Sequence, residues 1–140
     1  MVVGTTQGKQ WTETLPTDRG AHFTGRTFFR LHILAEGLPV IGEIWATSDH
    51  AVNGHSHEAD EMLYVLNGAI EVNGQALGKN ELAFIPAGSH YTARIVSDGG
   101  GHVLRIAFPS ATRHDEPPEY DSRPWAGPLT HDGFPDLARE

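Results

Sequence analysis

The sequence contains no cysteine, which excludes disulfides, thiolate metal ligands and cysteine nucleophiles. Positive charge is also scarce. The chain has 10 Lys and Arg residues against 18 Asp and Glu residues, and its formal net charge of −8 disfavours nucleic acid and anionic membranes as partners. No run of about 18 apolar residues is present, and the first residues lack the apolar core of a signal peptide. These absences predict a cytoplasmic protein with no nucleic-acid or membrane partner.

A single all-β domain is the architecture that the length and composition favour. At 140 residues the chain has room for one ordinary core, and its 16 glycines and 9 prolines favour turns over long helices. From Thr27 onward, short apolar segments alternate with turn residues about every 8–12 residues, which is typical of a sandwich or barrel. The dipeptide Asn73-Gly74 predicts a tight hairpin turn. We expect strands at 28–34, 41–47, 61–67, 69–72, 82–85, 92–96 and 102–108.

Composition divides the chain into three parts. Residues 1–26 are polar and rich in Gly and Thr, and they predict an irregular N-terminal arm. Residues 27–109 hold the expected barrel. Residues 110–140 form an acidic tail; six of the nine prolines lie at position 109 or later, so no sheet is expected there. The tail also carries Tyr120, Trp125, Leu129 and Phe134, which favour docking on the domain or on a partner subunit, while a free acidic tail is the alternative.

The segment from His55 to Glu61 carries three possible metal ligands at alternate positions. On an extended chain His55 and His57 point to the same side, and Glu61 has the same parity at the start of the next apolar run. A fourth candidate, His90, follows the turn-like sequence Pro86-Ala87-Gly88-Ser89. Taken alone a His-x-His pair is weak evidence, because surface histidines and buried neutral histidines are also common. The glutamate at matching parity strengthens the metal interpretation.

These residues resemble the two motifs of the cupins, small jelly-roll β-barrels that usually hold a divalent metal. The first cupin motif places His-x-His, a glutamate and a glycine at the spacing of His55, His57, Glu61 and Gly68. The second motif contains Pro-x-Gly, matched by Pro86 and Gly88. The resemblance covers about residues 28–108 and implies a cupin-type double-stranded β-helix.

The second motif departs from the cupin pattern at its histidine. The pattern places a histidine where Tyr91 stands, one residue after His90. Tyr91, Ala93 and Ile95 form an apolar set that suits the barrel interior, and His90 shares the opposite phase with Arg94. We expect a bulge after Gly88 to aim His90 at the metal, and the alternative leaves a three-ligand site with only Tyr91 or His102 nearby. If both residues of the opposite phase point inward, Arg94 reads an anionic group there.

The implied function is a metal-dependent enzyme that acts on a small oxygenated molecule. The ligands His55, His57, Glu61 and His90 suit one divalent ion per chain, with Fe(II) favoured by the resemblance and Mn, Ni, Co or Zn as alternatives. We expect Glu61, Tyr91 and Arg94 to take part in catalysis. A quercetinase-like dioxygenase is the first expectation, by resemblance alone. A redox-neutral isomerase or lyase and a non-catalytic binding protein are the alternatives.

The segment from Met62 to Leu66 predicts a homodimer. Glu61, Leu63 and Val65 face the expected cavity, so Met62, Tyr64 and Leu66 need another cover. A second copy of the chain provides that cover in our interpretation, and the N-terminal arm is the alternative.

Overall fold

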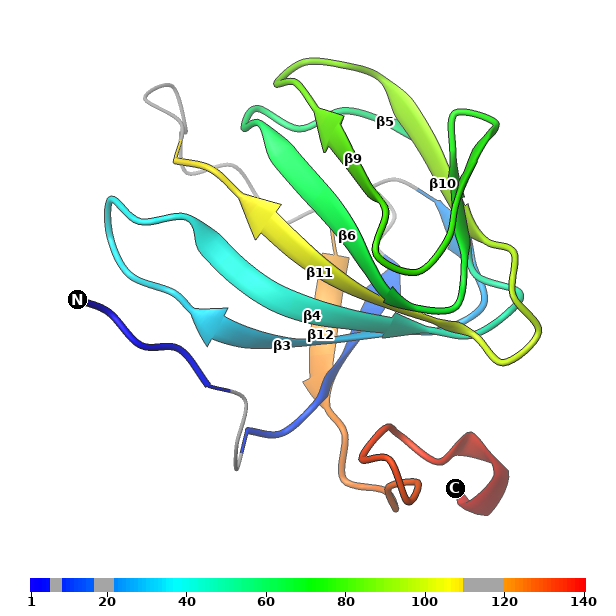
Figure 1. The fold of residues 1–140 in the computed structure, drawn as a ribbon. Coiled ribbons are helices and arrows are strands. Elements are labelled where there is room, and N and C mark those ends of the chain that lie inside the picture. Colours follow the sequence, from blue (N-terminus) through cyan, green and yellow to red (C-terminus); the bar gives the residue numbers. More distant parts are fainter. Residues whose placement is uncertain (6–8, 17–21, 110–119) are drawn as a thin grey trace.

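The computed structural model describes residues 1–5, 9–16, 22–109 and 120–140, and these form two antiparallel sheets that face each other (Figure 1). The seven-stranded sheet has the order β12-β1-β3-β4-β11-β6-β9 and the five-stranded sheet the order β2-β5-β10-β7-β8. The strands are β1 (Thr12–Pro16), β2 (Phe23–Thr24), β3 (Thr27–Ile33), β4 (Val40–Ala46), β5 (Ala51–His55), β6 (Glu61–Asn67), β7 (Ile70–Val72), β8 (Gln75–Leu77), β9 (Leu82–Ile85), β10 (Tyr91–Ile95), β11 (Gly101–Ala107) and β12 (Tyr120–Pro124). One short 3₁₀ helix, η1, spans Leu137–Arg139.

Alternation along the strands builds the main core between the two sheets. In β6 the buried residues Leu63 and Val65 alternate with half-buried neighbours, and Val65 is fully buried. Val103 of the neighbouring strand β11, and Val72 and Ile95 of the facing sheet, contribute in the same way. Each of these side chains points between the sheets because successive residues of a strand point to opposite faces.

The all-β prediction is confirmed. Each of the seven expected strands is present, with bounds that differ by at most one residue. The hairpin at Asn73-Gly74 joins β7 to β8, and both residues have positive φ, 49° and 80°. A tight hairpin turn of this type requires that conformation.

The prediction that residues 1–26 form an irregular arm is wrong for part of that segment. Strand β1 pairs with β3 on one side and with β12 on the other, and β2 pairs with β5. Trp11, directly before β1, is only 2% exposed. This structure depends on burial of the Trp11 ring and on pairing with strands that are distant in sequence. Local periodicity in the sequence therefore could not predict it.

The expectation that no sheet enters the tail was also wrong, because β12 pairs with β1 over five residues. β12 is the outermost strand of its sheet and ends at Pro124. A proline is tolerated there because an edge strand has one side without ladder hydrogen bonds.

A second core covers the part of the outer face of the seven-stranded sheet that lies over β3 and β4. Trp11, Phe28 and Trp125 are buried against one another, and Trp45 and Phe134 pack on them. The described part of the tail therefore docks on the domain. Docking was one of the two alternatives in the sequence analysis, and a free acidic tail was the other.

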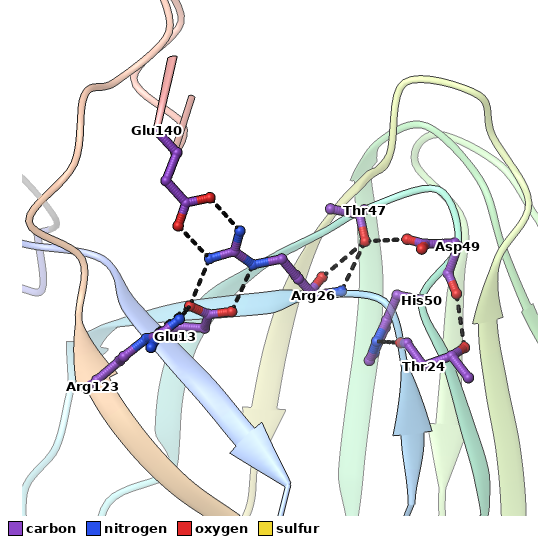
Figure 2. A network of polar contacts seen from close by, with 8 residues as sticks. All are labelled: Glu13, Thr24, Arg26, Thr47, Asp49, His50, Arg123 and Glu140. Carbon is purple, nitrogen blue, oxygen red and sulfur yellow. Dashed lines mark hydrogen bonds and ion pairs between the residues drawn. The ribbon is translucent and has the colours of Figure 1, made fainter. Parts of the chain in front are cut away.

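Ion pairs fix this docked segment. Arg26 donates to Glu13 at 2.8 and 2.9 Å and to Glu140 at 2.6 and 3.1 Å, so one guanidinium holds the C-terminal residue to a buried carboxylate of β1 (Figure 2). Arg123 of β12 donates to the same Glu13. Among the described residues, no helix is long and apolar enough to cross a membrane.

Candidate functional site

A β-bulge in β5 orients the first histidine of the site. Tyr91 pairs with His55 and Ala93 pairs with Val52, so three steps along β5 match two steps along β10. Directly paired residues of antiparallel strands point to the same face. The extra residue therefore turns both Val52 and His55 inward, although a regular strand would point them to opposite faces.

Polar contacts hold the beginning of β5 in place. Thr24 of β2 donates from Oγ1 to the carbonyl oxygen of Asp49 at 2.8 Å, and His50 Nδ1 lies 3.0 Å from the carbonyl oxygen of Thr24 (Figure 2). Burial lowers the pKa of His50, so its neutral form is favoured. These contacts attach β5 to β2 before the bulge begins.

Three rings meet at the other end of β5. The ring centroids of His55 and His57 lie 4.8 Å apart in an edge-to-face arrangement, and that of Tyr91 lies 4.4 Å from His55 and 6.0 Å from His57. The loop before β10 is attached here, because Gly88 N donates to the carbonyl oxygen of His57 at 2.8 Å. The two imidazoles and the phenol thus share one small region.

Glu61 is the carboxylate of this region and is 1% exposed. Its Oε1 accepts a hydrogen bond from the Tyr91 hydroxyl and lies 4.0 Å from His57 Nε2. Its Oε2 accepts from Arg105 of β11, with Nε and Nη2 each 2.8 Å away. The buried negative charge is therefore compensated by a guanidinium, as a buried carboxylate requires.

The donor atoms suit a divalent transition metal. His55 Nδ1 lies 2.9 Å from the carbonyl oxygen of Asn53, which can only accept, so Nδ1 carries the proton and Nε2 keeps its lone pair. The 4.0 Å between His57 Nε2 and Glu61 Oε1 lies within the span of about 4.2 Å that two bonds of about 2.1 Å to one ion allow. In the described part of the chain, no three His, Cys, Asp or Glu side chains converge closely enough to define a metal site by geometry. The match between these residues and a metal ion rests on the chemistry of their donor atoms and on the distance between His57 and Glu61.

The structure does not bring His90 into this group. His90 is exposed, and its ring lies over Gly54, where a Cβ atom would come within 2.5 Å of Nε2. Tyr91, only 6% exposed, takes the inward position. The bulge that we expected after Gly88 lies instead in β5 opposite β10, so the inward orientation expected for His90 is corrected. Strand phase decides this outcome, since Tyr91 shares the inner face with Ala93.

Arg94 also lies outside the site. It pairs in register with Glu71 of β7, and its Nε and Nη2 donate to the Glu71 carboxylate at 3.0 and 3.2 Å. This corrects the catalytic position that we expected for Arg94. The inner guanidinium is that of Arg105, which the sequence analysis missed. The available signal was one charged residue in the inward phase of β11, between Val103 and Ala107.

A cleft of about 400 Å³ reaches Tyr91 from the side of the barrel. It runs between β8 and β9, the neighbouring edge strands of the two sheets, and Val72, Leu77 and Ile85 line it beside Tyr91. The polar side chains of Asn73, Gln75 and Ser89 also line this cleft, so it suits a small organic molecule that carries polar groups.

Solved structures share this architecture at low sequence identity. The sequence matches no protein-family model and no curated protein. The fold is similar to the polyketide cyclase RemF from Streptomyces resistomycificus, with a TM-score of 0.61, 18% identity and coverage of 76% of this chain and 79% of that chain. KdgF from Halomonas sp. gives a TM-score of 0.58 and 15% identity, with 82% and 96% covered. An RmlC-like cupin from Shewanella frigidimarina gives 0.53 and 17%, with 70% and 92% covered. Identities this low establish the fold alone.

Proposed function

We propose, starting from the cupin fold of this chain, that it is a metal-dependent enzyme that moves a proton on a small oxygenated substrate. His55, His57 and Glu61 would hold one divalent ion, and Tyr91 would transfer the proton. The observation that carries the proposal is the buried hydrogen bond from Tyr91 to Glu61 beside two histidines.

The bound ion would supply Lewis acidity, which makes a carbon-bound hydrogen next to a carbonyl group easier to remove. The chain's own residues provide the path for that proton. Because the Tyr91 hydroxyl donates to Glu61 Oε1, it can pass its proton to the carboxylate while its oxygen accepts one from the substrate. The reverse transfer returns the proton to a different substrate atom. On another carbon or oxygen it completes an isomerisation, and on a leaving group, which then departs with that proton, it completes an elimination.

Each residue has a distinct task in this scheme. Arg105 keeps Glu61 in place from the opposite side, on Oε2, so that Oε1 stays directed at Tyr91. The apolar residues of the cleft, Val72, Leu77 and Ile85, would contact the carbon atoms of the substrate beside Tyr91. Tyr91 belongs to both the cleft and the hydrogen bond, so it connects the substrate to the carboxylate.

The dioxygenase expected from the resemblance remains a prediction, and so do iron as the ion and the cytoplasm as the location. A hydrogen-bonded proton-transfer pair favours redox-neutral chemistry, which needs no oxygen and no change in metal oxidation state. Among the similar structures, RemF is described as a polyketide cyclase, which supports an enzymatic role for this fold but does not name a substrate here.

Oxygen dependence separates the two reactions. Protein loaded in turn with Fe(II), Mn(II) and Zn(II) is assayed against enolisable acids, 1,3-diketones and flavonols, in air and under argon. We expect equal rates in air and argon and activity with Zn(II). One O₂ consumed per turnover, with no activity under argon or with Zn(II), would replace this proposal with the dioxygenase. Absence of turnover under every condition would favour a binding protein.

A further inference from the structure

In the described strands, Arg105 and Glu61 are the two charged residues whose side chains face the inside of the barrel. It pairs in register with Leu63 of β6 and Gly42 of β4, and Leu63 belongs to the main core. Its side chain is 32% exposed, whereas that of Glu61 is 1% exposed. Arg105 therefore joins a deeply buried carboxylate to a region that solvent reaches.

The guanidinium uses only part of its hydrogen-bonding capacity on Glu61. Nε and Nη2 both approach the same carboxylate oxygen, Oε2. An arginine presents five N–H donors in a planar fork with more than one bidentate edge. Among the described residues, no acceptor is bonded to Nη1. The second edge is thus available to a ligand that comes from the exposed side.

The inner face beside Arg105 is also open. Phe29 and Leu31 of β3 share a face with Ile44 and Gly42 of β4, which in turn pair with Val103 and Arg105 of β11. Despite this inward register, Phe29 and Leu31 are only half-buried. Solvent therefore reaches the inner face on the β3 side, next to the guanidinium.

Charge balance indicates what such a ligand would be. The strand residues that face inward contribute one negative charge, from Glu61, and one positive charge, from Arg105. The histidines contribute none when neutral. A divalent cation on His55, His57 and Glu61 would therefore add two uncompensated positive charges in a region of low dielectric constant, where they strongly favour an anionic partner.

We propose that Arg105 binds the anionic group of the substrate, and that the substrate is a small carboxylic acid with a second oxygen next to the carboxylate. One edge of the guanidinium holds Glu61 and the other receives the substrate carboxylate in charge-assisted hydrogen bonds. This inference rests on the proposed function, because the second oxygen completes a chelate on the proposed ion. It takes the role that the sequence analysis gave to Arg94.

Oxalate is the probe, because it is a small dianion that chelates divalent metals. Calorimetric titration of Mn(II)-loaded protein with oxalate compares wild type with Arg105→Met and with Arg94→Met. Arg94→Met removes the same charge from the outer surface, where Arg94 pairs with Glu71. We expect Arg105→Met to retain Mn(II) and to lose oxalate affinity on the order of 10- to 100-fold. Arg94→Met should bind as wild type does. Wild-type oxalate affinity in Arg105→Met with Mn(II) retained would overturn the inference and leave the metal site standing.

Two further measurements keep the test decisive. If Arg105→Met does not fold, Arg105→Lys keeps a cation beside Glu61 but has no second bidentate edge, so it should still lose about tenfold or more, and wild-type affinity would overturn the inference. If wild type binds no Mn(II), the proposed function fails by itself. The rise in unfolding temperature that oxalate causes in metal-free protein then tests Arg105 alone. A rise that Arg105→Met or Arg105→Lys loses supports the anion site, and a rise that persists in the variant, or none in wild type, overturns it.

Discussion

The Tyr91 hydroxyl donates a buried hydrogen bond to the Glu61 carboxylate, which joins strand β10 of one sheet to strand β6 of the other. Both residues take part in the proposed proton transfer, but only Glu61 would also bind the ion. Tyr91→Phe should therefore keep the metal and lower turnover by about 10²- to 10⁴-fold, the usual contribution of one acid–base group. Elemental analysis beside steady-state kinetics checks this, and loss of metal in Tyr91→Phe would make the phenol a ligand instead.

The ligand assignment predicts metal content directly. Purified wild type should hold about one divalent ion per chain, and His57→Ala or Glu61→Ala should remove most of it while the barrel stays folded. His90→Ala should keep the metal, because His90 is exposed and lies against Gly54. His131→Ala, in the C-terminal segment, is the control for loss of an exposed histidine. Full metal content in both the His57 and Glu61 variants would exclude the assignment.

Local pattern was sufficient to predict the strands that alternate regularly, and it placed His55, His57 and Glu61 together. It could not predict the pairing of β1 with β12, because residues 12–16 and 120–124 are separated by most of the chain and neither has a long apolar alternation. The same limit applies to the second core, in which Trp11 meets Trp125. Such contacts depend on tertiary packing, which overrides local propensity.

The fourth ligand position, for which the sequence predicted His90, shows a different limit of prediction from sequence. The sequence defined the conflict between His90 and Tyr91. Strand phase and the spacing of the motif both favoured position 91, but the motif requires a histidine, and the histidine of this chain stands at position 90. The structure follows strand phase and places the bulge in β5, where it turns His55 inward. A bulge changes the phase of a strand by one residue without a distinct sequence signal, so its location could not be derived from alternation.

Gly68, the glycine that ends the first motif, has a steric role that can be separated from its conformation. Gly68 and Gly74 have nearly equal positive φ, 81° and 80°. A Cβ atom at Gly68 would lie 2.6 Å from the carbonyl oxygen of Gly100, whereas at Gly74 it would meet nothing within 4 Å. Gly74→Ala should cost about 1–2 kcal/mol of unfolding free energy for its conformation alone. Gly68→Ala should cost about 1–3 kcal/mol more, because the backbone must move. Urea denaturation measures both, and equal losses would contradict the steric argument.

Glu13 should make stability depend on pH in the acid range. Hydrogen bonds from Arg26, and then from Arg123, lower the pKa of this buried carboxyl below its ordinary value of 4.5, against the opposing effect of burial. A lowered folded-state pKa means that the stabilisation is present above about pH 4.5 and is lost as the pH falls through the folded-state value.

At pH 7, Glu13→Gln should lower the unfolding free energy by about 1.5–3 kcal/mol, and the difference from wild type should shrink below pH 4.5. Glu71→Gln, which affects a surface pair, should change little at either pH. A difference for Glu13→Gln that does not vary between pH 7 and pH 3.5 would refute the linkage.

A homodimer remains the prediction for the apolar outer face of β6, β9 and β11. Met62 lies in register with Phe84 and Ile106, and Phe84 is 53% exposed. The C-terminal segment covers Phe28 and Trp45 on the same sheet, so the uncovered apolar area is confined to this end of the face. Exposed Phe84 and its half-buried neighbours Met62 and Ile106 form a contiguous apolar surface, which favours association with a second copy.

Sedimentation at micromolar concentration tests the dimer with a single substitution and its control. Wild type should sediment at about twice its chain mass of 15.3 kDa. Phe84→Glu should sediment as a monomer, because a charge in the middle of an apolar interface must lose its hydration without gaining a partner. Leu129→Glu changes a residue of similar exposure, 47%, in the C-terminal segment outside this face, and it should leave the dimer intact. The metal content of monomeric Phe84→Glu should equal that of wild type, since every proposed ligand comes from one chain. A wild type that sediments as a monomer would refute the dimer without affecting the site.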